Sequence, residues 1–194
     1  DASANEIELK NLRAQLNPHF MFNSLNSIRA LVGLEPEQAK SAITRLSTLL
    51  RHSINLGKQK VVKLEDEIEL VKNYLELEKI RFEERLQIDY KVAENSLSCQ
   101  FPPLMLQTIV ENSIKHGISK SIDGGKICLE SSFDKDTLVL KIANPGELNM
   151  SAAENGVGIA NTNKRLEILY GEGGLFEIKQ EGNMVVSTIK IKYG

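Results

Sequence analysis

Residues 104–118 read LMLQTIVENSIKHGI, and this stretch says more about the fold than any other part of the chain. Apolar residues at positions 106, 109, 110 and 114 recur with helical spacing, which predicts a helix over Leu104–His116 with one buried face. Asn112, Lys115 and His116 lie three and four residues apart, so they share the polar face. An amide oxygen suits Mg²⁺ and an ammonium group suits phosphates. The alternative is an ordinary polar helix end that Gly117 closes.

Strand and helix patterns alternate on both sides of this helix. Helical periodicity is found over 64–82 and 158–170, and strand-like patterns over 86–92, 126–133, 137–143, 175–181 and 184–193. From residue 86 onward the order is β-α-β-β-α-β-β, which predicts a mixed sheet with helices on one face. We therefore expect residues 61–194 to form a two-layer α/β sandwich.

The first sixty residues have a different pattern. Helical stripes run over 9–31 and 37–57, with a break at Gly33-Leu34-Glu35-Pro36 between them. Two long helices with a short connection fold back as an antiparallel hairpin. After Pro18 the first helix is apolar nearly all round, so it needs more than one partner surface. The expected fold class is α+β: an N-terminal helical hairpin, residues 1–60, which dimerises as a four-helix bundle, followed by the sandwich.

A histidine lies within the first predicted helix, in the sequence NPHFMFN at 17–23. A proline inside a helix removes one backbone hydrogen bond and tends to kink it, which would expose the imidazole of His19. A neutral imidazole nitrogen is a nucleophile toward phosphorus, and Asn23 lies one turn further along the same surface. The alternative is a surface histidine beside a structural proline.

Two glycine-containing segments flank a loop near the end of the chain. Asn144-Pro145-Gly146 begins it, and Gly156-Val157-Gly158-Ile159-Ala160-Asn161 leads into the last predicted helix. Glycines at a helix start allow backbone N–H groups to approach phosphate oxygens. The alternative is an ordinary glycine turn, and no Gly-Lys-Ser/Thr follows that would make it a P-loop.

The composition excludes several classes of protein. Lys and Arg total 24 against 26 Asp and Glu, so no global attraction to nucleic acid is expected. The two cysteines have no metal-ligand spacing, which favours a reducing compartment. No apolar run approaches the roughly 20 residues of a membrane helix. The chain starts at Asp1 without Met, so we expect a fragment whose membrane anchor, if it has one, lies in a segment absent from it.

In their joint order these motifs resemble the LytS/YehU-type sensor histidine kinases. The matching stretches run from about Leu9 to Tyr193 and include NPHFMFNSLN, YLELEKIRF, PPLMLQ, VENSIKHGI, IANPG and NGVGIANTNKRLEILYG. The resemblance implies that residues 1–60 are the dimerisation and histidine phosphotransfer hairpin. It implies that residues 61–194 are a catalytic ATP-binding domain of the GHKL superfamily, which includes gyrase and chaperone ATPases.

The resemblance also implies roles for individual residues. ATP with Mg²⁺ would bind between the 104–116 helix and the glycine loop, and the γ-phosphoryl would pass to His19 and then to an Asp of a response regulator receiver domain. Asn23 matches a residue that supports removal of phosphate from the regulator, and Glu147–Asn155 would be a mobile lid. The implied nucleotide-binding residues are Asn112 as the Mg²⁺ ligand, Lys115 and His116 at the phosphates, Asn144 and Gly146 at the adenine, and Gly156, Gly158 and Asn161 on the phosphate side. The expected setting is a homodimer at the cytoplasmic side of the cell membrane.

The sequence departs from the family pattern in three places. Asn144 stands where an Asp usually accepts the adenine amino group, Pro145 replaces the usual Asn, and Phe20 follows the histidine where many histidine kinases carry an acidic base. Related ATPases have a water-activating Glu four residues before Asn112, where this chain has Thr108. The alternatives are therefore a non-catalytic dimeric signalling module with a degenerate nucleotide site and, third, an ATPase of the superfamily.

Overall fold

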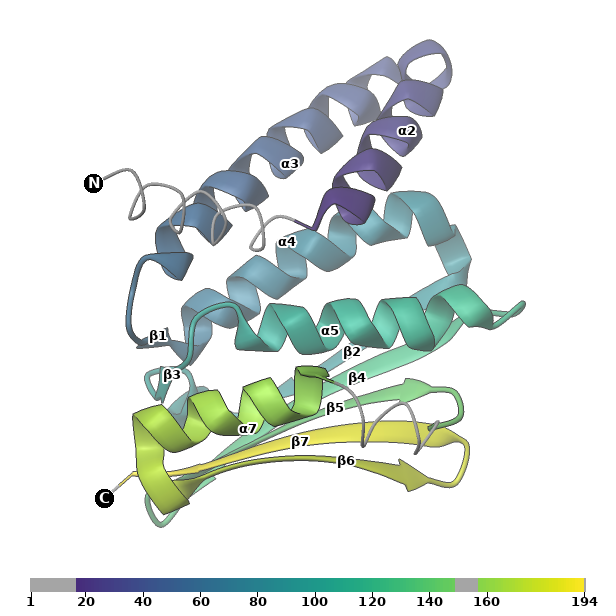
Figure 1. Cartoon of the computed structure of the whole chain (residues 1–194). Coiled ribbons are helices and arrows are strands. Elements are labelled where there is room, and N and C mark those ends of the chain that lie inside the picture. The colour runs from purple at the N-terminus through teal and green to yellow at the C-terminus, as the bar shows by residue number, and fades with distance from the viewer. Residues whose placement is uncertain (1–16, 149–156, 194) are drawn as a thin grey trace.

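The computed structural model describes residues 17–148 and 157–193, which form a helical hairpin stacked on an α/β unit (Figure 1). The helices are α2 (Pro18–Leu34), α3 (Pro36–Gly57), α4 (Leu64–Phe82), α5 (Met105–His116) and α7 (Val157–Tyr170). The strands are β1 (Val62–Lys63), β2 (Leu86–Val92), β3 (Gln100–Phe101), β4 (Gly125–Asp134), β5 (Thr137–Pro145), β6 (Gly174–Glu181) and β7 (Met184–Lys192). Within these ranges no helix is long and apolar enough to cross a membrane.

The main sheet has five strands in the order β2-β4-β5-β7-β6. β2 and β4 are parallel, while the other neighbours are antiparallel, so the mixed sheet predicted from the sequence is confirmed. Lys135 and Asp136 have positive φ in the tight turn between β4 and β5, and Gly182 has positive φ in the turn between β6 and β7. Primed hairpin turns of this kind match the twist of the strands they join.

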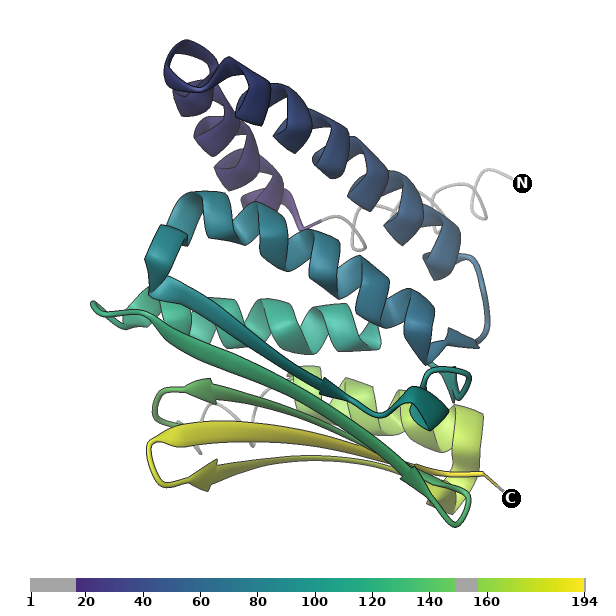
Figure 2. The same ribbon diagram turned by 180° about the vertical axis from the view of Figure 1, so that it is seen from behind.

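Helices cover one face of this sheet. Figures 1 and 2 show α4, α5 and α7 on the same side of the five strands. Alternate residues of the strands point into this layer and are buried: Ile127, Leu129, Leu138, Leu140, Ile142, Ile189 and Ile191. On β2 and β4, Lys91 and Glu130 form an exposed ion pair at 2.9 Å. The two-layer sandwich follows from this period-2 alternation.

Contacts at the start of α5 fix the position of that helix. The buried Glu67 of α4 accepts hydrogen bonds from the backbone N–H groups of Leu104 and, at 3.0 Å, Leu106. The first N–H groups of a helix have no partner within it, so this carboxylate satisfies that of Leu106 and also binds the N–H of Leu104, the residue before the helix. Arg165 of α7 donates to the Pro103 carbonyl at 2.7 Å. α4, α5 and α7 therefore meet at one end of α5.

The first described helix starts at the proline. Asn17 is extended and its Oδ1 accepts a hydrogen bond from the Phe20 N–H at 3.2 Å, so Asn17 is the N-cap and Pro18 is the first helical residue. The prediction of a helix that continues through Pro18 and kinks there is wrong, because proline lacks an N–H and its fixed φ suits the first helical position. The part of that prediction over residues 9–16 lies outside the described residues.

The hairpin packs on α4, on the side away from the sheet. α2 and α3 run antiparallel, as predicted, and both contact α4 (Figure 2). The ring of Phe20 lies 4.8 Å from that of Tyr74, and Leu46, Leu49 and Leu56 of α3 are buried. The hairpin thus adds a helical layer to the sandwich. The division of the chain into domains at residue 60 stays a prediction.

A carboxylate is buried in this helical layer. Glu78 of α4 is 3% exposed, and its Oε2 has no hydrogen-bond partner among the described residues. The nearest cation is Arg81, whose Nη1 lies 3.7 Å away. Burial raises the pKa of Glu78 to about 7, while the charge of Arg81 lowers it and that of Glu111 raises it. The ionised form is therefore disfavoured in the folded protein.

We expect Glu78→Gln to stabilise the protein above pH 7. Because the folded-state pKa of Glu78 is above its ordinary value of 4.5, the folded state binds more protons between pH 4.5 and about 7, and its stability falls as pH rises through this window. A neutral Gln escapes this loss, on the order of 1–3 kcal/mol. Urea unfolding at pH 5 and pH 8 measures it. Glu76→Gln, at a half-exposed ion pair with Lys79, is the control and should change little. If Glu78→Gln lowers stability at pH 8, the Arg81 ion pair outweighs the burial cost.

Candidate functional site

The polar face of α5 is open to solvent. Asn112, Lys115 and His116 are all exposed, and none of the three has a hydrogen-bond or ion-pair partner in the described part of the chain. Partial burial and the nearby charges of Lys120 and Lys115 lower the pKa of His116. The residues predicted to share a face therefore do so, in a positive region that suits phosphate oxygens.

A neighbouring side of α5, about 100° round the helix from Asn112, carries the helix's one carboxylate. Glu111 is partly buried and faces the hairpin, where it accepts hydrogen bonds from Asn17 and Gln107. Burial raises its pKa, and these two bonds oppose the rise. Thr108, one turn before Asn112, donates its hydroxyl to the Leu104 carbonyl. The helix face that carries Asn112 therefore has no carboxylate for activating water.

The end of β5 lies against the C-terminus of α5. A β-carbon at Gly117 would lie 2.5 Å from Asn144 Nδ2 and 2.7 Å from the Pro145 carbonyl oxygen, so only glycine fits there. Gly146 has φ +144°, and its N–H donates to the Asn183 carbonyl at 3.1 Å. This close approach brings the segment Asn144–Gly146 next to His116. Gly117 ends the helix as predicted, and it also allows this contact.

Asn144 keeps one of its polar atoms available. The side chain is 5% exposed, and its Nδ2 donates to the Pro145 carbonyl at 3.0 Å. Its Oδ1 makes no hydrogen bond within the described residues, and this oxygen is not fully buried. An open amide oxygen in this position can accept a bond from an amino group, as the adenine role requires.

The second glycine segment is only partly described. Gly158 and Asn161 lie near the start of α7, which begins at Val157, close to the predicted residue 158, and Asn161 is exposed. Gly156 lies outside the described residues, as does the predicted lid beyond Leu148. Figures 1 and 2 show α7 beside α5 on the same face of the sheet.

The residues present fit a magnesium–nucleotide group. In the described part of the chain no three His, Cys, Asp or Glu side chains cluster to hold a metal on their own. Mg²⁺ usually keeps several waters and takes few protein ligands together with substrate phosphates. The free amide oxygen of Asn112 is one such ligand, and Lys115 and His116, one turn away, can contact the phosphates.

His19 and Asn23 occupy the first turns of α2. His19 is exposed, and Asn23 Nδ2 lies 3.2 Å from His19 Nδ1 and 3.5 Å from Nε2. The two residues, predicted to share a surface one turn apart, therefore lie within hydrogen-bond distance of each other. The two orientations of a side-chain amide are nearly identical in shape. A half-turn of the Asn23 amide would therefore place its oxygen, an acceptor, next to His19 Nδ1.

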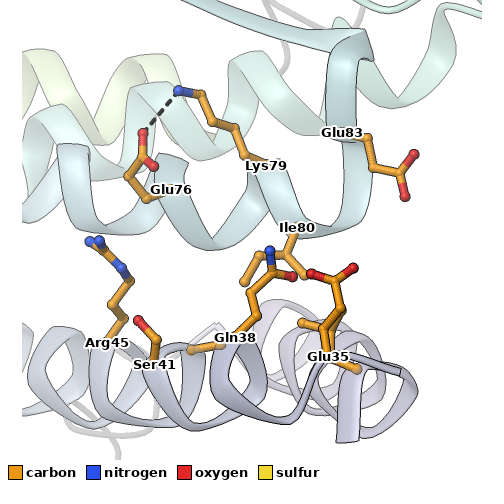
Figure 3. Close-up of a pocket in the computed structure, with 10 residues that line it drawn as sticks. Glu35, Gln38, Ser41, Arg45, Glu76, Lys79, Ile80 and Glu83 are labelled. Atoms are coloured by element: carbon orange, nitrogen blue, oxygen red, sulfur yellow. Dashed lines mark hydrogen bonds and ion pairs between the residues drawn. The ribbon is translucent and has the colours of Figure 1, made fainter. Parts of the chain in front are cut away.

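A groove lies between the hairpin and α4, apart from all these residues. It is lined mainly by polar and charged side chains of α3 and α4, including Gln38, Arg45, Glu76 and Lys79 (Figure 3). Lys79 and Glu76, which both belong to α4, form an ion pair at 2.9 Å along one wall of the groove. None of the predicted site residues lines this groove.

We expect Asn144→Asp to bind ATP more tightly and to be less stable. A charged acceptor strengthens a hydrogen bond from about 1 to about 1.5–3 kcal/mol, which corresponds to a several-fold tighter complex. The same change removes the Nδ2–Pro145 bond and buries a charge, so the melting temperature should fall. Calorimetric titration and thermal unfolding measure the two effects. Weaker ATP binding would show that the site needs the amide nitrogen.

A profile of the histidine kinase family matches residues 7–86. The chain is 38% identical over 172 residues to the sensor histidine kinase BtsS of Escherichia coli strain K12. This alignment covers 88% of this chain and 30% of BtsS. It is 31% identical over 206 residues to the sensor protein LytS of Streptococcus mutans, covering 98% of this chain and 35% of LytS. The chain thus spans about a third of the length of these relatives.

Solved structures share the fold. The histidine kinase AdeS of Acinetobacter baumannii superposes with a TM-score of 0.51 at 18% identity, over 84% of this chain and 82% of AdeS. The catalytic domain of the histidine kinase ThkA gives a TM-score of 0.53 at 17% identity, over 68% of this chain and 94% of that domain. The fold class predicted from the sequence is confirmed, and so is the resemblance. Residues 7–86 thus match the histidine kinase family, and nearly the whole chain is similar to sensor histidine kinases.

Proposed function

We propose that this chain is the kinase core of a two-component sensor, which phosphorylates its own His19 with ATP and Mg²⁺ and passes the phosphoryl group to an Asp of a response regulator. The observation that carries the proposal is the placement of an exposed, unpartnered Asn112–Lys115–His116 face next to the Asn144–Gly146 segment. The exposed His19 lies on α2, and the N-cap residue of α2, Asn17, is hydrogen-bonded to Glu111 of α5. The similarity to sensor histidine kinases supports the same reaction.

The nucleotide would lie between α5 and the segment that follows β5. Asn112 would supply an oxygen to Mg²⁺, and Lys115 and His116 would contact the phosphates. Asn144 Oδ1 would accept the adenine amino group beside Gly146, and the start of α7 at Gly156, Gly158 and Asn161 would bind the phosphate side. When bound, Mg²⁺ neutralises part of the phosphate charge, and the remaining catalysis is positioning.

The reacting group on this chain is one imidazole nitrogen of His19. With the amide oxygen of Asn23 turned toward Nδ1, it would accept the Nδ1–H and leave the lone pair of Nε2 free. That lone pair attacks the γ-phosphorus, an N–P bond forms, and the bond to the bridging oxygen breaks as ADP leaves. Asn23 next to the ring is also placed to act when phosphate is removed from the regulator.

Hydrolysis and simple signalling are the competing functions. Thr108 occupies the position from which a carboxylate would activate water, so transfer to a protein nucleophile is favoured over hydrolysis. A degenerate module would not bind ATP. Calorimetry with Mg·ATP, followed by incubation with γ-labelled ATP, separates the three. A kinase binds ATP and retains acid-labile label, an ATPase binds it and releases phosphate without label, and a degenerate module does neither.

We place the core at the cytoplasmic side of the membrane, where ATP and receiver domains are found, attached through a segment outside this chain. The relatives BtsS and LytS carry sensor names and are about three times longer. A purified receiver domain supplied to the labelled protein should take up the phosphoryl group on Asp.

We expect the chain to form a homodimer through the hairpin. Phe22, Leu25 and Val32 are 68%, 50% and 57% exposed and lie on one side of α2. A second copy of the hairpin buries this apolar stripe and completes a four-helix bundle. Phe22→Asp combined with Leu25→Asp should give a monomer in sedimentation experiments at micromolar concentration. Ile168→Asp, at an exposed apolar residue of α7, is the control and should stay dimeric. A wild-type monomer would contradict the prediction.

A further inference from the structure

A chain of side-chain hydrogen bonds joins the hairpin to α5. Asn17 Nδ2 donates to Glu111 Oε2 at 3.2 Å, and Gln107 Nε2 donates to Glu111 Oε1 at 2.9 Å. On the other side, Ser53 of α3 donates to Gln107 Oε1 at 3.4 Å. Both oxygens of the partly buried carboxylate are therefore occupied, one by the hairpin and one by its own helix.

The amide of Asn17 performs two tasks. Its Oδ1 caps α2 by accepting the Phe20 N–H, and its Nδ2 binds Glu111. His19 follows Asn17 by two residues, and Asn112 directly follows Glu111. The hydrogen bond thus joins the start of α2, which carries His19, to α5, which carries the proposed magnesium ligand Asn112.

A second contact sets the rotation of α2. Phe20 is 5% exposed and packs against Tyr74 of α4, which leaves His19, one residue earlier, facing solvent. Toward the closed end of the hairpin the groove of Figure 3 lies between α3 and α4. The polar anchor between hairpin and α5 is therefore at the His19 end.

We propose that Asn17, Glu111 and Gln107 are positioning residues for phosphoryl transfer, with the Asn17–Glu111 hydrogen bond holding the first turn of α2 in the register that presents His19 to the nucleotide. The inference rests on the proposed function, since it takes His19 as the acceptor. A displacement of about 1 Å between reacting groups can cost about 100-fold in rate. Loss of this bond should therefore lower the rate of transfer and leave nucleotide binding unchanged.

The test is an exchange of hydrogen-bond polarity in the full chain. In Asn17→Asp the new carboxylate still caps α2 but faces the carboxylate of Glu111, so the interhelix bond is lost. In the double variant Asn17→Asp with Glu111→Gln, the new amide at position 111 donates to the carboxylate at position 17 and still accepts from Gln107, so the bond is restored with donor and acceptor exchanged. We expect autophosphorylation to fall by about 10–100-fold in the single variant. The double variant should recover most of it, with KM for ATP the same in all three proteins.

Two further variants complete the test. Asn17→Ser keeps a capping hydroxyl but cannot reach Glu111, so it should lose rate without adding charge. Gln38→Glu makes the same amide-to-carboxylate change elsewhere on the hairpin, at an exposed residue, and should have no effect. Thermal unfolding and ATP binding show that each variant is folded.

The outcomes are distinct. If the wild type takes up no label at all, the proposed function fails. If the wild type is labelled but Asn17→Asp and Asn17→Ser are labelled as fast or faster, the positioning role is wrong. If the double variant, which has the same net charge as the wild type, stays as slow as Asn17→Asp, the carboxylate at position 17 and not the lost bond caused the effect, which also overturns the inference.

Discussion

Substitution of His19 by Gln should abolish autophosphorylation, with labelling reduced more than about 1000-fold. The amide of Gln keeps the approximate size of the ring but has no nucleophilic lone pair, so no N–P bond can form. His19 lies outside the residues proposed to bind ATP, so the dissociation constant for Mg·ATP should not change. The measurement is labelling with γ-labelled ATP, with acid and base treatment of the product, because a phosphoramidate is lost in acid and stable in base.

His52→Gln is the matched control for this prediction. His52 lies on α3 and has no hydrogen bond or ion pair within the described residues, so its loss should leave labelling intact. His116 is proposed to contact the phosphates from the ATP-binding unit itself, where in-line attack on the γ-phosphorus is geometrically poor. Full labelling of His19→Gln, or acid-stable label on Ser or Thr, would show that another residue is the acceptor.

Asn112→Ala should remove the magnesium dependence of ATP binding and, with it, the kinase activity. A charge-assisted interaction of about 1.5–3 kcal/mol corresponds to about 10–100-fold weaker binding. The transfer rate should fall further, because the charge that develops on the phosphates is stabilised through the same ligand. Titration calorimetry with and without Mg²⁺ measures the first effect, and labelling at saturating ATP measures the second.

Thr108→Ala is the control on the same helix. Thr108 is exposed one turn before Asn112, and its hydroxyl donates to the Leu104 carbonyl. Its loss should leave both ATP binding and labelling within about twofold, given that such surface changes usually cost under about 0.5 kcal/mol. If Asn112→Ala binds Mg·ATP as the wild type does, another residue ligates the metal. If Thr108→Ala releases phosphate from ATP more slowly than the wild type does, the threonine takes part in ATP hydrolysis.

The sequence by itself determined the strands of the main sheet, most of the helices and the shared faces of those helices. Asn112, Lys115 and His116 could be placed on one exposed face because helical spacing depends only on local geometry. The same holds for His19 and Asn23, one turn apart. Alternating residues in β4, β5 and β7 predicted the sheet, since burial of one face imposes a period of two.

Local patterns were insufficient where two signals competed. The apolar stripe before Pro18 favoured one continuous helix, but the capping bond from Asn17 to the Phe20 N–H starts α2 at the proline. Likewise, Gly117 could be predicted as a helix end, whereas its close approach to Asn144 depends on the path of a strand that comes much later in the chain.

Only the tertiary structure decided which distant side chains meet. Glu67 at the start of α5, Arg165 on the Pro103 carbonyl and Asn17 on Glu111 join residues that are 37, 62 and 94 positions apart. No periodicity records such pairs, because each depends on how whole helices pack once their apolar faces are buried. Hydrophobic burial is non-directional, so the sequence pattern determines which face turns inward. The few polar groups buried with that face must find partners, and these partners set the register between the hairpin and the α/β unit.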